Sequence, residues 1–466
     1  MRGDGAHLGP AALDRSPAPA PGRPWALAVG LLAGMGVLFF SSYGLANWLA
    51  SQHADVPYFH FGWERGIPFV PWSIVPYWSI DLLYGLSFFL WSTRADLLTH
   101  VKRLLAAQLV SVACFIAFPL RFAFARPEAD GLPGQLFTLL GGFDKPFNQA
   151  PSLHISLLVI LWAAYAAHLQ GGWRWLMHLW FALIGVSVLT TYQHHFIDVP
   201  TGWLVGWLCV FAFPLVPAEA AGSPDARLAR RYGMAAMLLG LTAVATLSVS
   251  VVAAFMLSWA AIALGCVAVI YRAGRPGAFQ KRADGTLPMP ALWVLWPYVL
   301  GAFANSRWWT RRQPAVSRLT DGVWIGRLPG EAELRESGAD AVLDLTAELP
   351  RLVTGVLYRC VPVLDLTVPS QAQLHAGVEA VEAWRQAGRT VLVSCALGYS
   401  RSALVAAAWL GAHAQLRDVQ QVLALLRQSR PAVVLGPQSV AALTRFLQTT
   451  VAGPQVSDSQ GAAHAD

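Results

Sequence analysis

The stretch Ser-Cys-Ala-Leu-Gly-Tyr-Ser-Arg-Ser at residues 394–402 decides the fold of the C-terminal part of the chain. An apolar run at 390–393 precedes it and predicts a buried strand, and residues 402–413 predict a helix. A cysteine and an arginine separated by five residues at a strand-to-helix turn are typical of an anion-binding loop. Backbone N–H groups of the loop and of the helix N-terminus converge on one point there and bind a phosphate.

Each polar side chain of this loop has a chemical role. The field of the N–H groups favours the thiolate form of Cys395, which is then a nucleophile, and Arg401 binds two phosphate oxygens through its planar fork. Gly398 lets the loop curl around the anion, and the Ser402 hydroxyl stabilises the departing thiolate. Asp365 follows another predicted strand and is the candidate acid for the leaving oxygen. We therefore expect phosphomonoester hydrolysis without a cofactor, and no residue spacing predicts a metal site.

Alternating strand and helix patterns surround this loop and predict an α/β domain with a mostly parallel sheet. The predicted strands are 323–325, 341–345, 358–363 and 390–393, and the predicted helices are 372–386, 402–413 and 419–427.

On the Cys395–Arg401 loop and Asp365, residues 308–448 resemble the dual-specificity subgroup of the protein tyrosine phosphatases. The resemblance implies a parallel-centred sheet flanked by helices and a phosphocysteine intermediate. Cys360 is expected to be a structural thiol, with a reversible redox partner for Cys395 as the alternative.

The rest of the chain has a different composition. Of all 466 residues, 55% are hydrophobic and only 13% are charged, whereas about 25% are charged in ordinary soluble proteins. This composition excludes a disordered chain and favours a membrane domain fused to a soluble one. About eight spans are expected, at 25–45, 73–91, 104–124, 152–168, 176–192, 201–216 and as a hairpin of two within 234–271. Residues 290–303, interrupted by Pro297, are expected to be interfacial or re-entrant.

Basic residues cluster near the ends of these runs, which predicts membrane orientation rather than nucleic-acid binding. One set of predicted loops holds Arg2, Arg15, Arg23, Arg94, Lys102, Arg103, Arg174, Arg227, Arg230 and Arg231, and the opposite set holds Arg65, Arg121, Arg126 and Lys145. The richer set should be cytoplasmic. We expect a multi-pass protein of a bacterial inner membrane with its phosphatase domain in the reducing cytoplasm.

A second constellation lies in the membrane part, where three distant segments reach the side opposite the phosphatase domain in this topology. His194 and Asp198 share one face of a helical turn, so the carboxylate can fix the tautomer of a nucleophilic imidazole. His154 can protonate a leaving oxygen, and Arg126 can hold a phosphoryl group.

Residues 67–214 resemble the type 2 phosphatidic acid phosphatase superfamily, in the branch close to inositol phosphorylceramide and sphingomyelin synthases. The resemblance implies a phosphohistidine on His194. Two cationic positions of the family pattern are Pro119 and Val188 here, and Arg121 lies near the first of them as a further candidate for substrate binding. Hydrolysis and headgroup transfer between lipids both remain open for this site.

The expected order is a disordered cytoplasmic tail (1–24), a membrane domain (25–217), a hairpin with a basic linker and an interfacial segment (218–306), the phosphatase domain (307–450) and a disordered tail (451–466). The expected function is a bifunctional membrane enzyme acting on phosphorylated lipids, with the lipid bilayer as its environment and no nucleic-acid partner. The first alternative is a protein tyrosine or serine phosphatase with a phosphoprotein substrate and a membrane anchor. The second is a lipid-binding or transporting membrane domain without catalysis.

Overall fold

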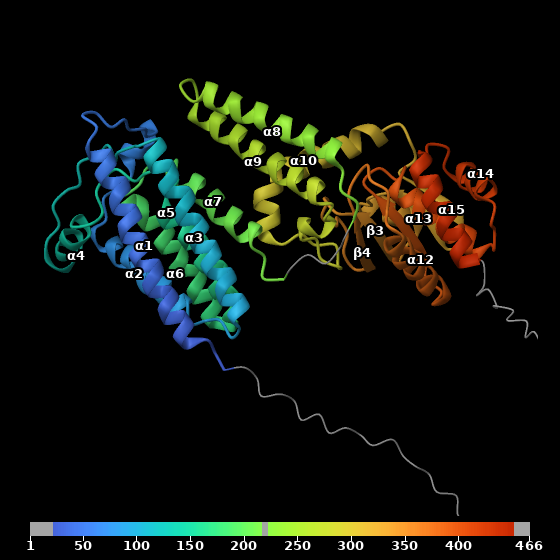
Figure 1. Ribbon diagram of the computed structural model, residues 1–466, viewed down its shortest axis with the longest axis horizontal. Helices are drawn as coiled ribbons and strands as arrows, with labels where there is room; N and C mark the ends of the chain where they lie inside the picture. Colours follow the sequence, from blue (N-terminus) through green and yellow to red (C-terminus); the bar gives the residue numbers. More distant parts are fainter. Residues whose placement is uncertain (1–21, 217–221, 452–466) are drawn as a thin grey trace, which may run out of the picture. The chain divides into compact units, whose positions relative to one another are not determined.

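The computed structural model describes residues 22–216 and 222–451. The two tails expected to be disordered lie almost wholly outside the described residues. The chain forms two compact units, Met1–Leu215 and Val216–Asp466, and Figure 1 labels most of their helices and two of the strands, β3 and β4.

Unit 1 is helical. Its helices are α1 (Trp25–Ser51), α2 (Ile74–Ser87), α3 (Arg94–Ala117), α4 (Gly131–Gly141), α5 (Leu153–His168), α6 (Gly171–Thr190) and α7 (Asp198–Ala212). One helix overlaps each of the six spans predicted here, and α4 was not predicted. In the described part of the whole chain, α1, α3, α6 and α9 (Val251–Ala273) are long and apolar enough to cross a membrane. The number of about eight spans stays a prediction.

Helix α3 begins ten residues before the predicted span. Thr93 caps it by accepting a hydrogen bond from the Asp96 N–H at 3.1 Å, and Asp96 lies favourably in the first turn. Lys102 and Arg103 therefore lie inside the helix, and their expected place in a loop was wrong. Arg103 is buried and its Nε donates to the Phe213 carbonyl oxygen at 2.8 Å, just after α7.

Close packing of α5 on α7 positions the polar ends of both helices. A β-carbon at Gly202 would lie 2.4 Å from the Ser152 carbonyl oxygen, and one at Gly206 would lie 2.7 Å from the Val159 side chain. Only glycine permits this approach. The Ser152 N–H also donates to the Asp198 carbonyl oxygen at 3.1 Å, so the start of α5 is fixed beside the start of α7.

Unit 2 begins with three helices, α8 (Ala226–Thr246), α9 and α10 (Met289–Thr310). The interruption expected at Pro297 does not occur, because Pro297 lies inside α10, a single helix of 22 residues. Proline has no N–H to offer the carbonyl four residues earlier. That carbonyl, on Trp293, accepts instead from the Trp259 indole of α9 at 3.0 Å.

A five-stranded sheet follows, in the order β1-β2-β5-β3-β4. The strands are β1 (Val316–Thr320), β2 (Val323–Arg327), β3 (Ala341–Thr346), β4 (Leu357–Val363) and β5 (Val391–Cys395). All neighbours are parallel except β1 and β2, which confirms the predicted α/β domain with a mostly parallel sheet. The edge strand β1 was not predicted.

The helices of this domain are α11 (Glu331–Ser337), α12 (Gln371–Gln386), α13 (Arg401–His413), α14 (Val419–Ser429) and α15 (Pro437–Val451). Helices α12, α13 and α14 match the sequence prediction, whereas α11 and α15 were not predicted. Helix α13 is buried from Arg401 to Gly411, so its N-terminus is held firmly at the end of β5.

The connection between α9 and α10 packs into the sheet domain. The Cys360 N–H of β4 donates to the Ala283 carbonyl oxygen at 2.8 Å. Lys281 is fully buried, forms an ion pair with Asp344 and donates to the Thr346 hydroxyl at 2.7 Å. The three apolar helices and the sheet therefore form one packed unit.

Candidate active site

The predicted anion-binding loop lies at the carboxyl end of the central strand β5. Cys395 ends β5, which pairs with β2 on one side and β3 on the other, and α13 begins at Arg401. The Cys395 sulfur accepts from the Gly398 N–H at 3.2 Å and lies 3.2 Å from Ser402 Oγ. The ends of parallel strands at a strand-to-helix turn are where ligands bind in such sheets, and the loop has the expected form.

Backbone geometry at Gly398 makes glycine necessary. Its φ is +76°, and a β-carbon there would lie 2.5 Å from the carbonyl carbon of Gly326 on β2. Its own carbonyl oxygen accepts from Arg430 Nε, just after α14, at 2.8 Å. The loop is therefore held on one side by the sheet and on the other by a buried arginine.

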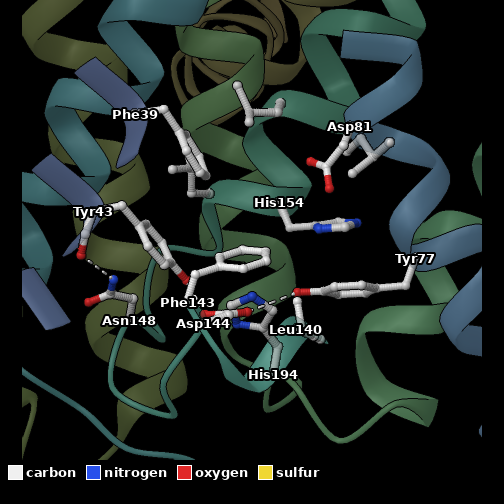
Figure 2. A pocket seen from close by; sticks show the side chains of 13 residues that line it. Phe39, Tyr43, Tyr77, Asp81, Leu140, Phe143, Asp144, Asn148, His154 and His194 are labelled. Carbon is white, nitrogen blue, oxygen red and sulfur yellow. Dashed lines mark hydrogen bonds between the residues drawn. The ribbon is translucent and has the colours of Figure 1, made fainter. Parts of the chain in front are cut away.

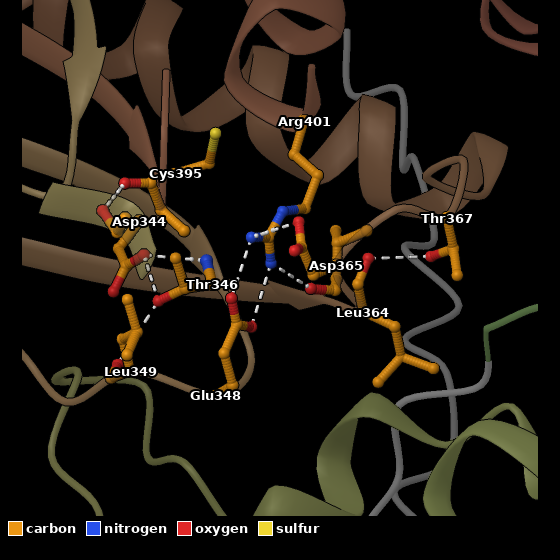
Figure 3. Close-up of polar contacts among 12 residues, drawn as sticks. Asp344, Thr346, Glu348, Leu349, Leu364, Asp365, Thr367, Cys395 and Arg401 are labelled. Atoms are coloured by element: carbon orange, nitrogen blue, oxygen red, sulfur yellow. Dashed lines mark hydrogen bonds and ion pairs between the residues drawn. The ribbon is translucent and has the colours of Figure 1, made fainter. Parts of the chain in front are cut away.

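Arg401 is anchored by a carboxylate that sequence reasoning missed. Its Nη1 and Nη2 donate to the two oxygens of Glu348 at 3.0 and 2.8 Å, and Nη1 also donates to the Val363 carbonyl oxygen at 2.8 Å (Figure 3). Burial alone would lower the pKa of Arg401, but Glu348 and Asp365 hold it well above its usual value. The guanidinium is therefore permanently charged and fixed in direction.

The predicted acid, Asp365, shares a cavity with Cys395 and contacts Arg401. It follows the end of β4 and lines the same cavity as Cys395, which has a volume of about 610 Å³. Its Oδ1 lies 2.9 Å from Arg401 Nη2.

Two side chains from the apolar helices hold the catalytic loops. The Tyr271 hydroxyl on α9 donates to the Asp365 carbonyl oxygen at 3.1 Å. The Ser306 hydroxyl on α10 donates to the carbonyl oxygen of Ala396, next to Cys395. Sequence reasoning missed both residues because it assigned their segments to the membrane and the linker.

Cys360 is separate from this chemistry. Its sulfur is buried and donates to the Thr346 carbonyl oxygen at 3.5 Å. Burial raises the pKa of Cys360 to about 12, so it stays a thiol at neutral pH. Among the residues that the structure describes, no group of three or more His, Cys, Asp and Glu side chains could hold a metal ion.

A comparison with sequence models of protein families matches residues 326–449 to the dual specificity phosphatase catalytic domain. Residues 326–449 form a dual-specificity phosphatase catalytic domain. The chain accordingly contains a phosphoric monoester hydrolase domain, and Cys395, Asp365 and Arg401 lie within the matched residues.

Solved structures similar to this domain include human DUSP28 (25% identity, covering 30% of this chain and 97% of that chain, TM-score 0.28). Tk-PTP in its active form has 29% identity, covers 29% of this chain and 97% of that chain, and has a TM-score of 0.27. PTPMT1 in complex with PI(5)P has 21% identity, covers 29% and 96%, and has a TM-score of 0.27. Among curated proteins, no match to the chain was found.

The second predicted constellation lies in unit 1, around a cavity of about 60 Å³ (Figure 2). His154 and His194 both line it. His194 Nδ1 lies 3.2 Å from Asp198 Oδ2, which also accepts from the His195 N–H at 2.9 Å. The His154 ring stacks on Tyr77 with the ring centroids 4.2 Å apart. The structure thus brings the predicted imidazoles and carboxylate together.

A further carboxylate, Asp144, projects into this cavity and was not predicted (Figure 2). It accepts a hydrogen bond from the Tyr43 hydroxyl at 2.6 Å and interacts electrostatically with His194 and Arg126. Arg126 lies over the Phe137 ring at 4.8 Å. The Asp144 carboxyl group therefore lies near Arg126, the predicted phosphate ligand.

Arg121 and His195 form their hydrogen bonds with groups that do not line this cavity. Arg121 does not line the cavity; its Nε donates to the Val56 carbonyl oxygen at 3.0 Å. His195 Nε2 accepts from the Ala123 N–H at 3.0 Å, which puts its proton on Nδ1, 2.9 Å from Glu64 Oε2. The structure gives Arg121 and His195 roles in packing, not in the cavity.

Proposed function

We propose that the chain is an integral-membrane enzyme whose phosphatase domain hydrolyses phosphomonoesters of lipids. The observation that carries this proposal is the hydrogen bonding of Tyr271 and Ser306, on apolar helices, to the backbone of both catalytic loops. Helix α9 is one of the helices long and apolar enough to cross a membrane. A phosphate displayed at a bilayer surface next to that helix is therefore close to Cys395.

In this proposal the Cys395 thiolate attacks phosphorus while Arg401 and the loop N–H groups hold the equatorial oxygens. The ester P–O bond breaks, and Asp365 gives its proton to the leaving oxygen. Water then attacks the phosphocysteine, and Asp365 takes up its proton. The thiolate departs with a hydrogen bond from the Ser402 hydroxyl, and inorganic phosphate is released.

The walls of the catalytic cavity favour a substrate with a single phosphate on an apolar alcohol. The loop positions between Cys395 and Arg401 carry no cationic side chain, and Val368, Leu397 and Val434 line the cavity. A headgroup with several phosphates would lack compensating charge here. The same uncharged walls also suit a phosphotyrosine, so a membrane-anchored protein phosphatase remains the alternative.

Purified Cys395→Ser, His194→Ala and double-mutant proteins, assayed on a lipid phosphate panel and on phosphopeptides, separate these functions. We expect Cys395→Ser to abolish hydrolysis of a lipid monophosphate and His194→Ala to retain it. Cys395-dependent turnover of phosphopeptides alone would favour the anchored protein phosphatase. Undiminished lipid hydrolysis in the double mutant would overturn the whole assignment.

We propose phosphoryl or headgroup transfer through a phosphohistidine as a second function, in unit 1. It is supported by the 3.2 Å contact of His194 with Asp198 and by the presence of His154 in the same cavity. This proposal keeps the topology expected from the basic residues, that of a bacterial inner-membrane protein. In it the phosphatase domain is cytoplasmic and the His194 site faces the outside of that membrane. Labelling of Cys395 by an impermeant maleimide in opened cells, and its absence in intact cells, would support this orientation.

A further inference from the structure

A second cavity adjoins the catalytic one in unit 2. It has a volume of about 280 Å³ and lies between the apolar helices and the catalytic loops. Leu264 on α9 and Gly301 and Ala302 on α10 line one part, while Asp365 and Leu397 line the other. Asp365 and Leu397 also line the cavity over Cys395, so the two cavities meet at the proposed acid.

The position of Asp365 between the cavities determines which part of a substrate enters the second one. In-line displacement places the leaving oxygen opposite the attacking sulfur of Cys395. Asp365 must lie within hydrogen-bond reach of that oxygen. The alcohol carried by the oxygen therefore extends past Asp365, away from Cys395 and toward α10.

The lining of this cavity combines hydrogen-bond donors with apolar surface. Tyr298 and Asn305 on α10 can donate to the glycerol ester oxygens of a lipid, whereas both oxygens of Glu348 already accept from Arg401. Gly301 and Ala302 on α10 and Leu264 on α9 are among the apolar lining residues. A β-carbon at Gly301 would meet no atom within 4 Å, so open space remains beside the helix.

The outward surface of the same helices is apolar. Leu300 on α10 is 52% exposed, and Met237 and Leu238 on α8 are 63% and 64% exposed. Exposed apolar surface of this kind is typical of helices in contact with lipid or a partner. An acyl chain that leaves the cavity along α10 thus stays on apolar surface.

We propose that this cavity binds the diacylglycerol part of a two-chain lipid phosphate, with its glycerol ester oxygens beside Asp365 and Tyr298 and its first methylenes beside Gly301. The inference rests on the proposed phosphatase activity at Cys395 and adds the substrate's binding site. Helices α8–α10 thereby select the lipid, and the phosphatase domain supplies the chemistry.

Gly301→Leu tests the inference because the added side chain fills the cavity without a backbone clash. Ala304→Leu is the matched control, since it adds the same side chain at an exposed position of α10 that does not line the cavity. The full chain is assayed in phosphatidylcholine vesicles that contain dioleoyl phosphatidic acid, and separately on p-nitrophenyl phosphate and a phosphotyrosine peptide.

We expect Gly301→Leu to lower the ratio of kcat/KM for phosphatidic acid to that for p-nitrophenyl phosphate at least tenfold, mainly through KM. Ala304→Leu should leave the ratio unchanged. An unchanged ratio in Gly301→Leu overturns the inference. An equal loss of kcat/KM for the phosphotyrosine peptide also overturns the inference, because the cavity would then bind peptide substrates as well.

A binding measurement distinguishes failure of the inference from failure of the proposed function. Cys395→Ser is irradiated with a phosphatidic acid analogue that carries a diazirine near the carboxyl end of one acyl chain. Crosslinking to the α10 peptide, lost in Cys395→Ser/Gly301→Leu, supports the cavity even where wild-type protein hydrolyses no phosphatidic acid. Absence of an α10 crosslink in Cys395→Ser overturns the cavity even where lipid hydrolysis at Cys395 is established.

Discussion

Replacement of Ser402 by alanine is expected to separate the two steps of the phosphatase reaction. Its Oγ lies 3.2 Å from Cys395 Sγ, and the side chain is fully buried in the first turn of α13. In the first step the sulfur loses its negative charge to the new bond, and in the second step the charge returns. A hydroxyl that donates to the sulfur therefore stabilises mainly the second step.

The size of the effect follows from the lost contact. A hydrogen bond to a charged group contributes about 1.5–3 kcal/mol, and about 1.4 kcal/mol corresponds to a tenfold change in rate. Hydrolysis of the phosphocysteine should therefore slow about 10- to 150-fold in Ser402→Ala. Alanine is a strong helix former, so α13 should be retained.

Rapid mixing with p-nitrophenyl phosphate measures both steps. Ser402→Ala should release a burst of one nitrophenol per active site and then turn over slowly. Ser394→Ala is the matched control, because Ser394 is buried next to Cys395 but donates to the Leu343 carbonyl oxygen at 3.2 Å. A burst of the same size in both variants, or an unchanged steady-state rate in Ser402→Ala, would refute the reasoning.

The remaining predictions concern the acid, the buried ion pair and the second thiol. Asp365→Asn should lower the rate of alkyl phosphate hydrolysis about 10²- to 10⁴-fold. The rate with 2,4-dinitrophenyl phosphate, whose leaving group needs no proton, should stay within a few-fold of the wild-type rate. Equal losses on both substrates would exclude the acid role. Lys281→Met leaves Asp344 buried without its counter-ion, which costs about 3–5 kcal/mol of stability. The midpoint temperature of thermal inactivation should fall, and it should partly recover in Lys281→Met/Asp344→Asn. An unchanged midpoint in Lys281→Met contradicts this prediction. Because the pKa of Cys360 is raised to about 12, the protonated thiol dominates below that pH, and mass spectrometry should find iodoacetamide on Cys395 but not on Cys360 at pH 8. Equal modification of Cys360 and Cys395 at pH 8 would contradict this prediction.

The parts of the site that sequence reasoning found are local. The loop from Cys395 to Arg401 is specified within one strand-to-helix turn, because its N–H groups, glycine and arginine act within a few residues of each other. Asp365 was found because it follows a recognisable strand. The parallel strands were predicted from apolar runs, which buried strands require on both faces.

The parts that were missed depend on distant partners. Glu348 contacts Arg401 across 53 residues, and nothing near it in sequence marks it as the anchor of an arginine. Tyr271 and Ser306 lie in apolar segments, and the hydropathy of a segment does not indicate which distant loops its side chains contact. The carbonyl that Pro297 leaves without its helical donor accepts from an indole of another helix, that of Trp259, and the local sequence does not indicate this partner.

The central claim is that the phosphatase domain acts on a lipid phosphate through Cys395. The most direct test is to mix Ser402→Ala with vesicles of phosphatidylcholine and ³²P-labelled phosphatidic acid, stop the reaction in acid and locate the label. We expect acid-stable label on the peptide that contains Cys395, removable by iodine, and none when Cys395→Ser is combined with Ser402→Ala. Release of labelled phosphate at the same rate without Cys395, or absence of acid-stable label on the Cys395 peptide while Ser402→Ala turns over the lipid, would contradict it.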